Sequence, residues 1–206
     1  MRLTDKISLV LLGAAFLLIT VSACNQQREP ELMLYDFNRQ ADLDRLSWSC
    51  RAFYALDKQH GVDGFSLRLE MYPAPYPGLK SGRMENNWTG YRLLCLEIFN
   101  PGPESLSLAC RLDDRRDNPP YADRVNLPVM LHPGANKVRL DLTALRTSGT
   151  RRPLDLSHIY GMYFFLCSPE KKVTLFIDNI RLCRQGAIQK GENCISSFRH
   201  IVSRNL

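Results

Sequence analysis

Residues 111–126 form the densest run of polar side chains in this sequence. The run is Arg-Leu-Asp-Asp-Arg-Arg-Asp-Asn-Pro-Pro-Tyr-Ala-Asp-Arg-Val-Asn. Recognition of a sugar needs planar polar groups that make paired hydrogen bonds to neighbouring hydroxyls, together with an aromatic face for the C–H surface of the ring. We therefore predict that the ligand-binding residues are Asp113, Asp117, Tyr121, Arg124 and Asn126, with Trp88 as an aromatic wall from a neighbouring loop.

Two other roles are open for the same polar segment. Aspartates and arginines at this spacing can pair with one another and fix a long loop, which would contribute little affinity for an external ligand. The segment could also form a protein interface. The aromatic run Tyr163–Phe165 is expected to be core and sheet-face packing rather than a binding strip.

Short segments with alternating apolar and polar residues must position these groups. In the strand that leads into the polar segment, period two places Leu106, Leu108, Cys110 and Leu112 on one face, and Ala109, Arg111 and Asp113 on the other. About nine such segments are separated by turn residues. Their ranges are 32–37, 48–54, 65–71, 93–99, 106–112, 125–131, 137–142, 159–166 and 173–182. Only 141–145 and 154–159 suggest single helical turns, so the pattern predicts an all-β, antiparallel β-sandwich.

Four stretches resemble the galactose-binding-like jelly rolls, a group that includes many carbohydrate-binding modules. They are Leu34–Phe37, Asp63–Leu69, Trp88–Pro101 and Leu175–Leu182, of which the last is the most specific. The resemblance covers residues 32–183 and implies a jelly-roll β-sandwich domain. Function follows less directly, because one fold supports many tasks.

The same resemblance implies a structural calcium ion between the first and last strands. Calcium requires carboxylate and carbonyl oxygens, and Asp36 and Asp178 match the positions that would supply them. Asn38 stands where an acidic residue is commoner. The alternative is that both aspartates cap strand ends and accept hydrogen bonds from the backbone.

The first 24 residues have the order of a secretory signal peptide. Arg2 and Lys6 precede an apolar run from Ile7 to Ile19, which is shorter than the ~20 residues of a spanning helix. The small residues that follow end at Cys24, as in a bacterial lipobox. We therefore expect a lipoprotein signal peptide over 1–23, an acylated (palmitate-type) Cys24, a polar tether over 24–31 and a C-terminal tail over 184–206. A plain signal peptide with a chance cysteine is the alternative. The lipoprotein reading places the protein in the cell envelope, on the outer membrane or the periplasmic face if the organism is Gram-negative.

Charge and cysteine content narrow the remaining possibilities. The net charge is +6, yet no Lys/Arg-rich block is present, so nucleic acid is not an expected partner. The seven cysteines lack the spacing of a zinc site. In an exported protein the six cysteines other than Cys24 suggest disulfides, with fifteen pairings open, and Cys183 with Cys194 is the first candidate because the two bracket a short polar loop.

No motif for catalysis is present. The sequence lacks a G-x-S-x-G elbow, an H-E-x-x-H pair and a glycine-rich phosphate loop. We therefore expect a non-catalytic, lipid-anchored envelope module that binds a carbohydrate or glycan-like polymer. The first alternative is a module that docks an envelope protein, and the weaker one is a glycoside hydrolase with an unfamiliar site.

Overall fold

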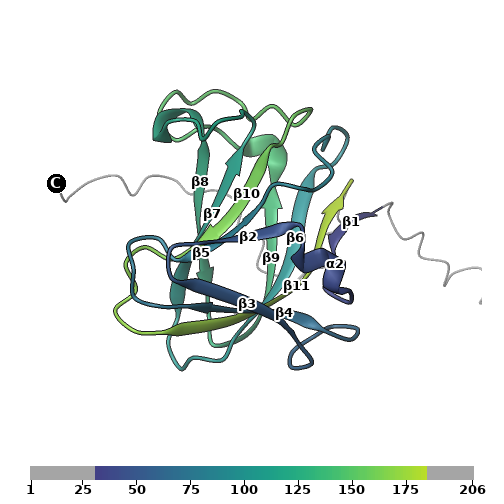
Figure 1. Ribbon diagram of the computed structural model, residues 1–206. Helices are drawn as coiled ribbons and strands as arrows, with labels where there is room; N and C mark the ends of the chain where they lie inside the picture. The colour runs from purple at the N-terminus through teal and green to yellow at the C-terminus, as the bar shows by residue number, and fades with distance from the viewer. Residues whose placement is uncertain (1–30, 185–206) are drawn as a thin grey trace, which may run out of the picture.

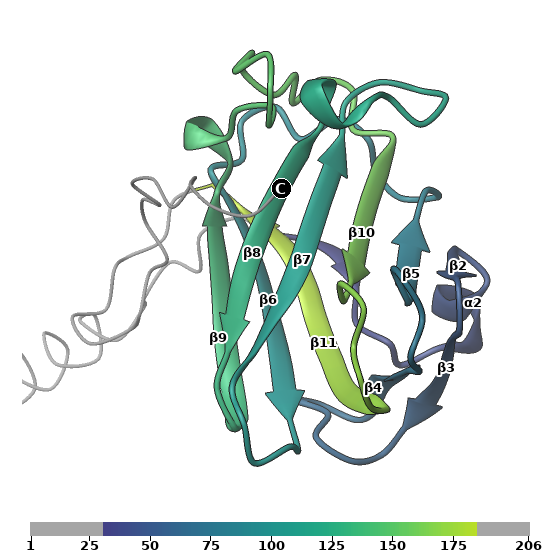
Figure 2. The same ribbon diagram turned by 90° about the vertical axis from the view of Figure 1, so that its left-hand side faces the viewer.

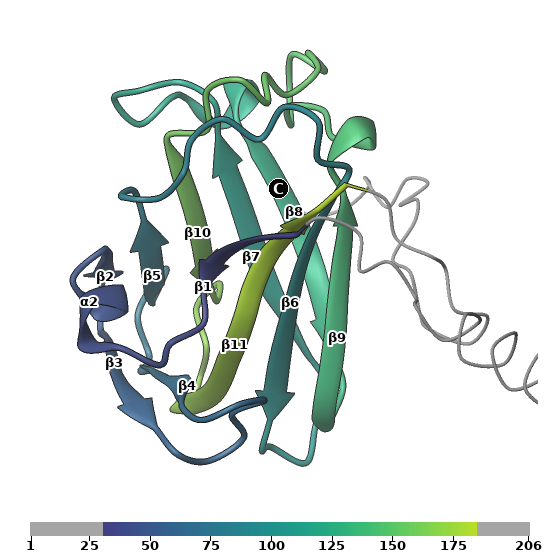
Figure 3. The same cartoon turned by 90° about the vertical axis from the view of Figure 1, so that its right-hand side faces the viewer.

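The computed structural model describes residues 31–184, whose strands form two packed antiparallel sheets (Figure 1). The six-stranded sheet has the order β3-β4-β11-β6-β9, with β1 paired to β11, and the five-stranded sheet has the order β2-β5-β10-β7-β8. Figure 2 faces the five-stranded sheet and Figure 3 the six-stranded one. The strands are β1 (Glu31–Tyr35), β2 (Leu46–Ser49), β3 (Ala52–Asp57), β4 (Ser66–Met71), β5 (Gly78–Ser81), β6 (Leu93–Asn100), β7 (Leu106–Asp113), β8 (Val125–Leu131), β9 (Gly134–Asp141), β10 (Gly161–Phe165) and β11 (Val173–Cys183). This is the all-β sandwich that the sequence predicts.

The long strand β11 organises the six-stranded sheet. Its first half, Val173–Ile177, pairs with β4, and its second half, from Ile180 to Cys183, pairs with β1. Asn179 lies between the halves with a φ of 57°, a left-handed conformation that asparagine tolerates better than most residues. The register places Glu31 opposite Cys183, so the described domain begins and ends at neighbouring positions.

The core lies between the two sheets and confirms the predicted alternation. Leu108, Cys110 and Leu112 are fully buried and Ala109 on the other face is partly exposed, whereas Arg111 and Asp113 on that other face are buried as an ion pair. Trp88 is also fully buried, and its Nε1 donates a hydrogen bond to the Glu85 carbonyl at 2.7 Å. The prediction that Trp88 forms a wall of the binding site is therefore corrected, because its ring packs in the core and is inaccessible to a ligand.

Two features of the strand prediction differ from the structure. The segment 48–54 is two strands, β2 and β3, because the chain turns at Cys50, whose φ is 55°. Strand β5 was not predicted, because the prolines at 73, 75 and 77 mark a loop.

The expected helical turn over 141–145 is the 3-10 helix η2 (Leu142–Ala144), capped by the Asp141 side chain, which accepts from the Thr143 amide at 3.0 Å. Residues 154–159 contain no helix, and the Asp155 side chain instead accepts from the Ser157 amide in a tight turn.

Several sequence predictions fall outside the described residues: the signal peptide over 1–23, Cys24, the tether as far as residue 30, residues 185–206 of the tail, and Cys194. Within residues 31–184 no helix is long and apolar enough to cross a membrane. Cys183 lies beside Cys95 of the adjacent strand β6, with the two sulfur atoms 3.4 Å apart. Cys95 is therefore a second possible partner for Cys183.

Candidate functional site

The solvent-facing side of the five-stranded sheet is hollowed into a groove of about 1270 Å³. We call it the sheet groove. Its lining comes from all five strands of the sheet and from the loops beside them, and its aromatic and cationic members are Tyr76, Tyr163, Phe165, Tyr121, Arg111, Arg124 and Lys171. It is the larger of the two best-formed depressions in the described part of the chain.

A row of side chains crosses the sheet at the centre of this face. The register places Lys80, Tyr163, Arg111 and Asn126 directly opposite one another on β5, β10, β7 and β8. The Lys80 Nζ lies 5.3 Å from the centroid of the Tyr163 ring, and the Arg111 guanidinium carbon lies 4.4 Å from it. The partly exposed Tyr163 ring is therefore held between two cations on the central strand.

The next row on the same face is apolar. It contains Gly78, Phe165, Ala109 and Pro128, again directly opposite one another. A Cβ at Gly78 would lie 2.5 Å from the Cβ of Phe165, so only glycine fits beside this ring. Tyr76, which is 58% exposed, packs edge-on against Phe165 with ring centroids 5.9 Å apart. This part of the groove presents aromatic surface rather than charge.

Arg111 is fixed by a paired contact with Asp113. Its Nε donates to Asp113 Oδ1 at 2.8 Å, and its Nη2 donates to Oδ2 at 2.6 Å and to Asn118 Oδ1 at 2.7 Å. Both oxygens of Asp113 are thus occupied, and the residue is 2% exposed. Asp113 therefore positions Arg111, and the prediction that it contacts a ligand directly is corrected because Arg111 occupies its carboxylate.

Three of the predicted ligand-binding residues line the sheet groove. Tyr121 is 63% exposed in the 3-10 helix η1 (Tyr121–Asp123), and the Arg124 guanidinium carbon lies 5.7 Å from its ring centroid. Asn126 follows on β8 and donates through Nδ2 to Ser148 Oγ at 3.0 Å. Asp117 is exposed on the preceding loop and does not line the groove.

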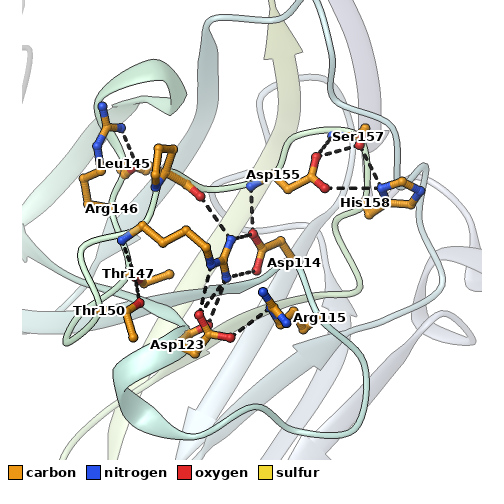
Figure 4. Close-up of polar contacts among 12 residues, drawn as sticks. Asp114, Arg115, Asp123, Leu145, Arg146, Thr147, Thr150, Asp155, Ser157 and His158 are labelled. Atoms are coloured by element: carbon orange, nitrogen blue, oxygen red, sulfur yellow. Dashed lines mark hydrogen bonds and ion pairs between the residues drawn. The ribbon is translucent and has the colours of Figure 1, made fainter.

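The loop that carries Tyr121 is held by an ionic network (Figure 4). Arg152 makes a bidentate contact with Asp114, at 2.5 Å and 2.9 Å, and also contacts Asp123 at 2.9 Å. Arg115 completes the network through Asp123 at 2.9 Å. Burial alone would raise the pKa of Asp114, but hydrogen bonds from Arg152 and from the Asp155 amide outweigh it and hold that pKa below its usual value. Asp114 and Asp123 therefore have the alternative role considered for the polar segment, because they pair with arginines and fix the loop.

The centre of the groove is therefore built from residues that the sequence analysis did not select. Tyr163 and Phe165 were assigned to packing. Phe164, which lies between them on β10, is 1% exposed in the core. Because successive side chains of a strand point to opposite faces, Tyr163 and Phe165 must then point outward. Lys80 contacts the Tyr163 ring without lining the groove itself, and it lies on β5, so no sequence pattern indicates it.

The two predicted calcium ligands, Asp36 and Asp178, both accept hydrogen bonds from backbone amides. Asp178 accepts from the Val62 and Asn179 amides, both at 2.7 Å, and Asp36 accepts from the Asn38 amide at 3.2 Å. Burial raises the pKa of Asp178, and Glu97 and Asp36 raise it further.

Within residues 31–184 no group of three or more His, Cys, Asp or Glu side chains could hold a metal. A calcium ion, which takes six to eight oxygens, would need backbone carbonyls or water as well. The backbone contacts agree with the strand-end alternative, and calcium stays a prediction.

No protein-family model matches the chain, and no curated protein is similar to it in sequence. Solved structures match well in shape. A family 11 carbohydrate-binding module from Clostridium thermocellum, solved in complex with a β-1,3-1,4-mixed-linked tetrasaccharide, aligns with a TM-score of 0.57 and 16% identity, over 74% of this chain and 95% of that one. A solution structure of CtCBM11 gives a TM-score of 0.59 and 14% identity, over 77% and 97%. An exo-β-agarase gives 0.60 and 19%, over 75% of this chain but only 25% of the agarase. The chain thus has the jelly-roll sandwich fold of the carbohydrate-binding modules.

Proposed function

We propose that this protein is a lipid-anchored, non-catalytic module that binds a carbohydrate or glycan-like polymer of the cell envelope in the sheet groove. The observation that carries the proposal is the partly exposed Tyr163 ring at the centre of the groove, flanked by Arg111 and Lys80. An aromatic face accepts the C–H surface of a sugar ring, and the fixed guanidinium supplies donors for its hydroxyls.

The size of the groove favours a chain of sugars over a single small molecule. Sites for small molecules usually enclose ~300–1,000 Å³, and this groove of about 1270 Å³ is larger and open along one sheet face. Phe165, with Tyr76 packed against it, lies one row along β10 from Tyr163, and Tyr121 lies in the loop just before β8. Successive rings of a polymer would thus meet separate aromatic surfaces.

Binding without catalysis is proposed because the acidic side chains of the groove lie in water. Hydrolysis of a glycosidic bond needs a pair of carboxyl groups, one of them protonated by its surroundings. The acids that line the groove are Glu104 and Glu170, and both are exposed. Glu104 has a side chain that is 76% exposed and forms an ion pair with Lys171. The similarity to the agarase also covers only a quarter of that enzyme.

The proposed anchor is a lipid on Cys24, which follows the small residues that end the apolar leader. Such an anchor would hold the module in the cell envelope, on the outer membrane or the periplasmic face of a Gram-negative cell. The alternative is that the same groove binds an envelope protein. The binding experiment must distinguish that partner from a glycan.

The experiment is a glycan array probed with the purified full-length chain in mild detergent, followed by titration of the retained glycan. We expect Tyr163→Ala to lower the affinity about tenfold, the effect of one lost aromatic contact of ~1.4 kcal/mol. Phe53→Ala is the matched control, because Phe53 is 61% exposed on β3 of the other sheet. Failure to retain any glycan, or an equal loss with both variants, would contradict the proposal.

A further inference from the structure

Arg124 is the one guanidinium lining the sheet groove that has no carboxylate partner within residues 31–184. The charge of Arg111 is offset by the bidentate Asp113. Arg124 makes no such contact with the described residues, and its guanidinium carbon lies 5.7 Å from the centroid of the Tyr121 ring. Within residues 31–184 its buried Nε atom has no hydrogen-bond acceptor, which is costly for a folded protein. The side chain as a whole is partly exposed and lines the groove, so a bound ligand can reach its guanidinium.

The surroundings of Arg124 contain charges of both signs, and none of them forms an ion pair with it within residues 31–184. Burial and the charge of Arg111 lower the pKa of Arg124 by more than Asp113, Tyr163 and Tyr121 raise it. On β5, the Lys80 Nζ lies 5.3 Å from the centroid of the Tyr163 ring and forms no ion pair with the described part of the chain. The acids of the groove, Glu104 and Glu170, lie on the loops before β7 and before β11, whereas Arg111 lies near the far end of β7. Among the residues that line this end of the groove, the charged side chains are Arg111 and Arg124, and Asp113 offsets the charge of Arg111.

A neutral sugar could accept a hydrogen bond here but would leave the charge uncompensated. A carboxylate satisfies both needs, because its two oxygens match the planar fork of a guanidinium. We propose that the glycan bound in the sheet groove is acidic, with a uronic acid ring on Tyr163 and its carboxylate paired with Arg124. The inference rests on the proposed function and specifies the class of saccharide.

The test compares polymers that share a backbone and differ in charge. The full-length chain is run in native gels that contain polygalacturonate or its fully methyl-esterified form, and carboxymethyl cellulose or hydroxyethyl cellulose. We expect the wild type to bind at least one charged polymer about tenfold more tightly than its neutral counterpart, which is the scale of one charge-assisted hydrogen bond. Arg124→Gln should remove that preference while leaving weak binding of the neutral polymer.

A basic protein can bind acidic polymers without a site, so a charge-matched control is needed. Arg83 is exposed and does not line the groove. Arg83→Gln removes the same charge and should change each affinity less than about twofold, as expected for a solvated surface charge. Equal losses in Arg124→Gln and Arg83→Gln would overturn the proposal, as would binding of dextran sulfate alone. If the wild type binds neutral polymers through Tyr163 without preferring charged ones, the acidic ligand is wrong and the proposed function stands. If no polymer binds, both fail.

Discussion

Replacing Arg152 by alanine should destabilise the domain strongly, because the change leaves the buried Asp114 carboxylate without its cationic partner. Arg152 contacts both oxygens of Asp114, at 2.5 Å and 2.9 Å, and it contacts Asp123 as well. The Asp114 side chain has no exposed surface. After the substitution, the hydrogen bond left to its side chain within residues 31–184 would be the one from the Asp155 amide, at 2.7 Å.

The size of the effect follows from this burial. Removing one partner of a fully buried ion pair costs ~3–5 kcal/mol. The Arg152 side chain is 26% exposed, so water can partly reach the site and we take the lower end, about 3 kcal/mol. For a domain of this size the melting temperature should fall by roughly 6–12 °C. Thermal unfolding followed by circular dichroism measures it.

Arg115→Ala is the matched control, because Arg115 contacts Asp123 at 2.9 Å with a side chain that is 59% exposed. An exposed pair contributes ~0–1 kcal/mol, so this variant should melt within a few degrees of the wild type. The lowered pKa of Asp114 adds a pH test: the stabilisation is complete above about pH 4 and is lost as the pH falls below it. The gap between Arg152→Ala and wild type should therefore narrow in acid. Equal melting of the two variants at neutral pH would refute the reasoning.

Three further predictions concern the core, the metal and the anchor. Trp88→Ala should cost ~3–5 kcal/mol because the ring is fully buried, whereas Trp48→Ala, at a side chain 63% exposed, should cost little; similar urea midpoints for the two would contradict this placement. If Asp36 and Asp178 bind calcium, a chelator should lower the melting temperature, since a ligand of the folded state stabilises by mass action; an unchanged melt with no metal by elemental analysis would remove the site. Cys24→Ser should release the protein from membranes or leave an unprocessed precursor, and normal processing with full membrane association would argue against lipidation.

Alternation of residue types predicted the sandwich and the faces of β7, because burial of every second residue is a local property of a strand. It did not predict the centre of the groove. Lys80, Tyr163 and Arg111 come from three strands far apart in the sequence and meet only through the register of the sheet. The prediction that Trp88 is exposed was wrong for a related reason. A tryptophan followed by Thr-Gly suggests an exposed loop, and its burial depends on residues elsewhere, including Leu156, whose carbonyl accepts from the Trp88 amide at 2.7 Å.

The pairing of Glu31 with Cys183 sets how this domain can be joined to anything else. Entry and exit lie side by side on the six-stranded sheet, and the groove opens on the opposite layer. A domain with adjacent ends can be spliced into a surface loop of a host protein, or circularly permuted, without stretching its strands. Neither junction lies on the five-stranded sheet that carries the groove. A fusion at either end should therefore leave the groove open, so the whole domain can be inserted into another protein with its groove accessible.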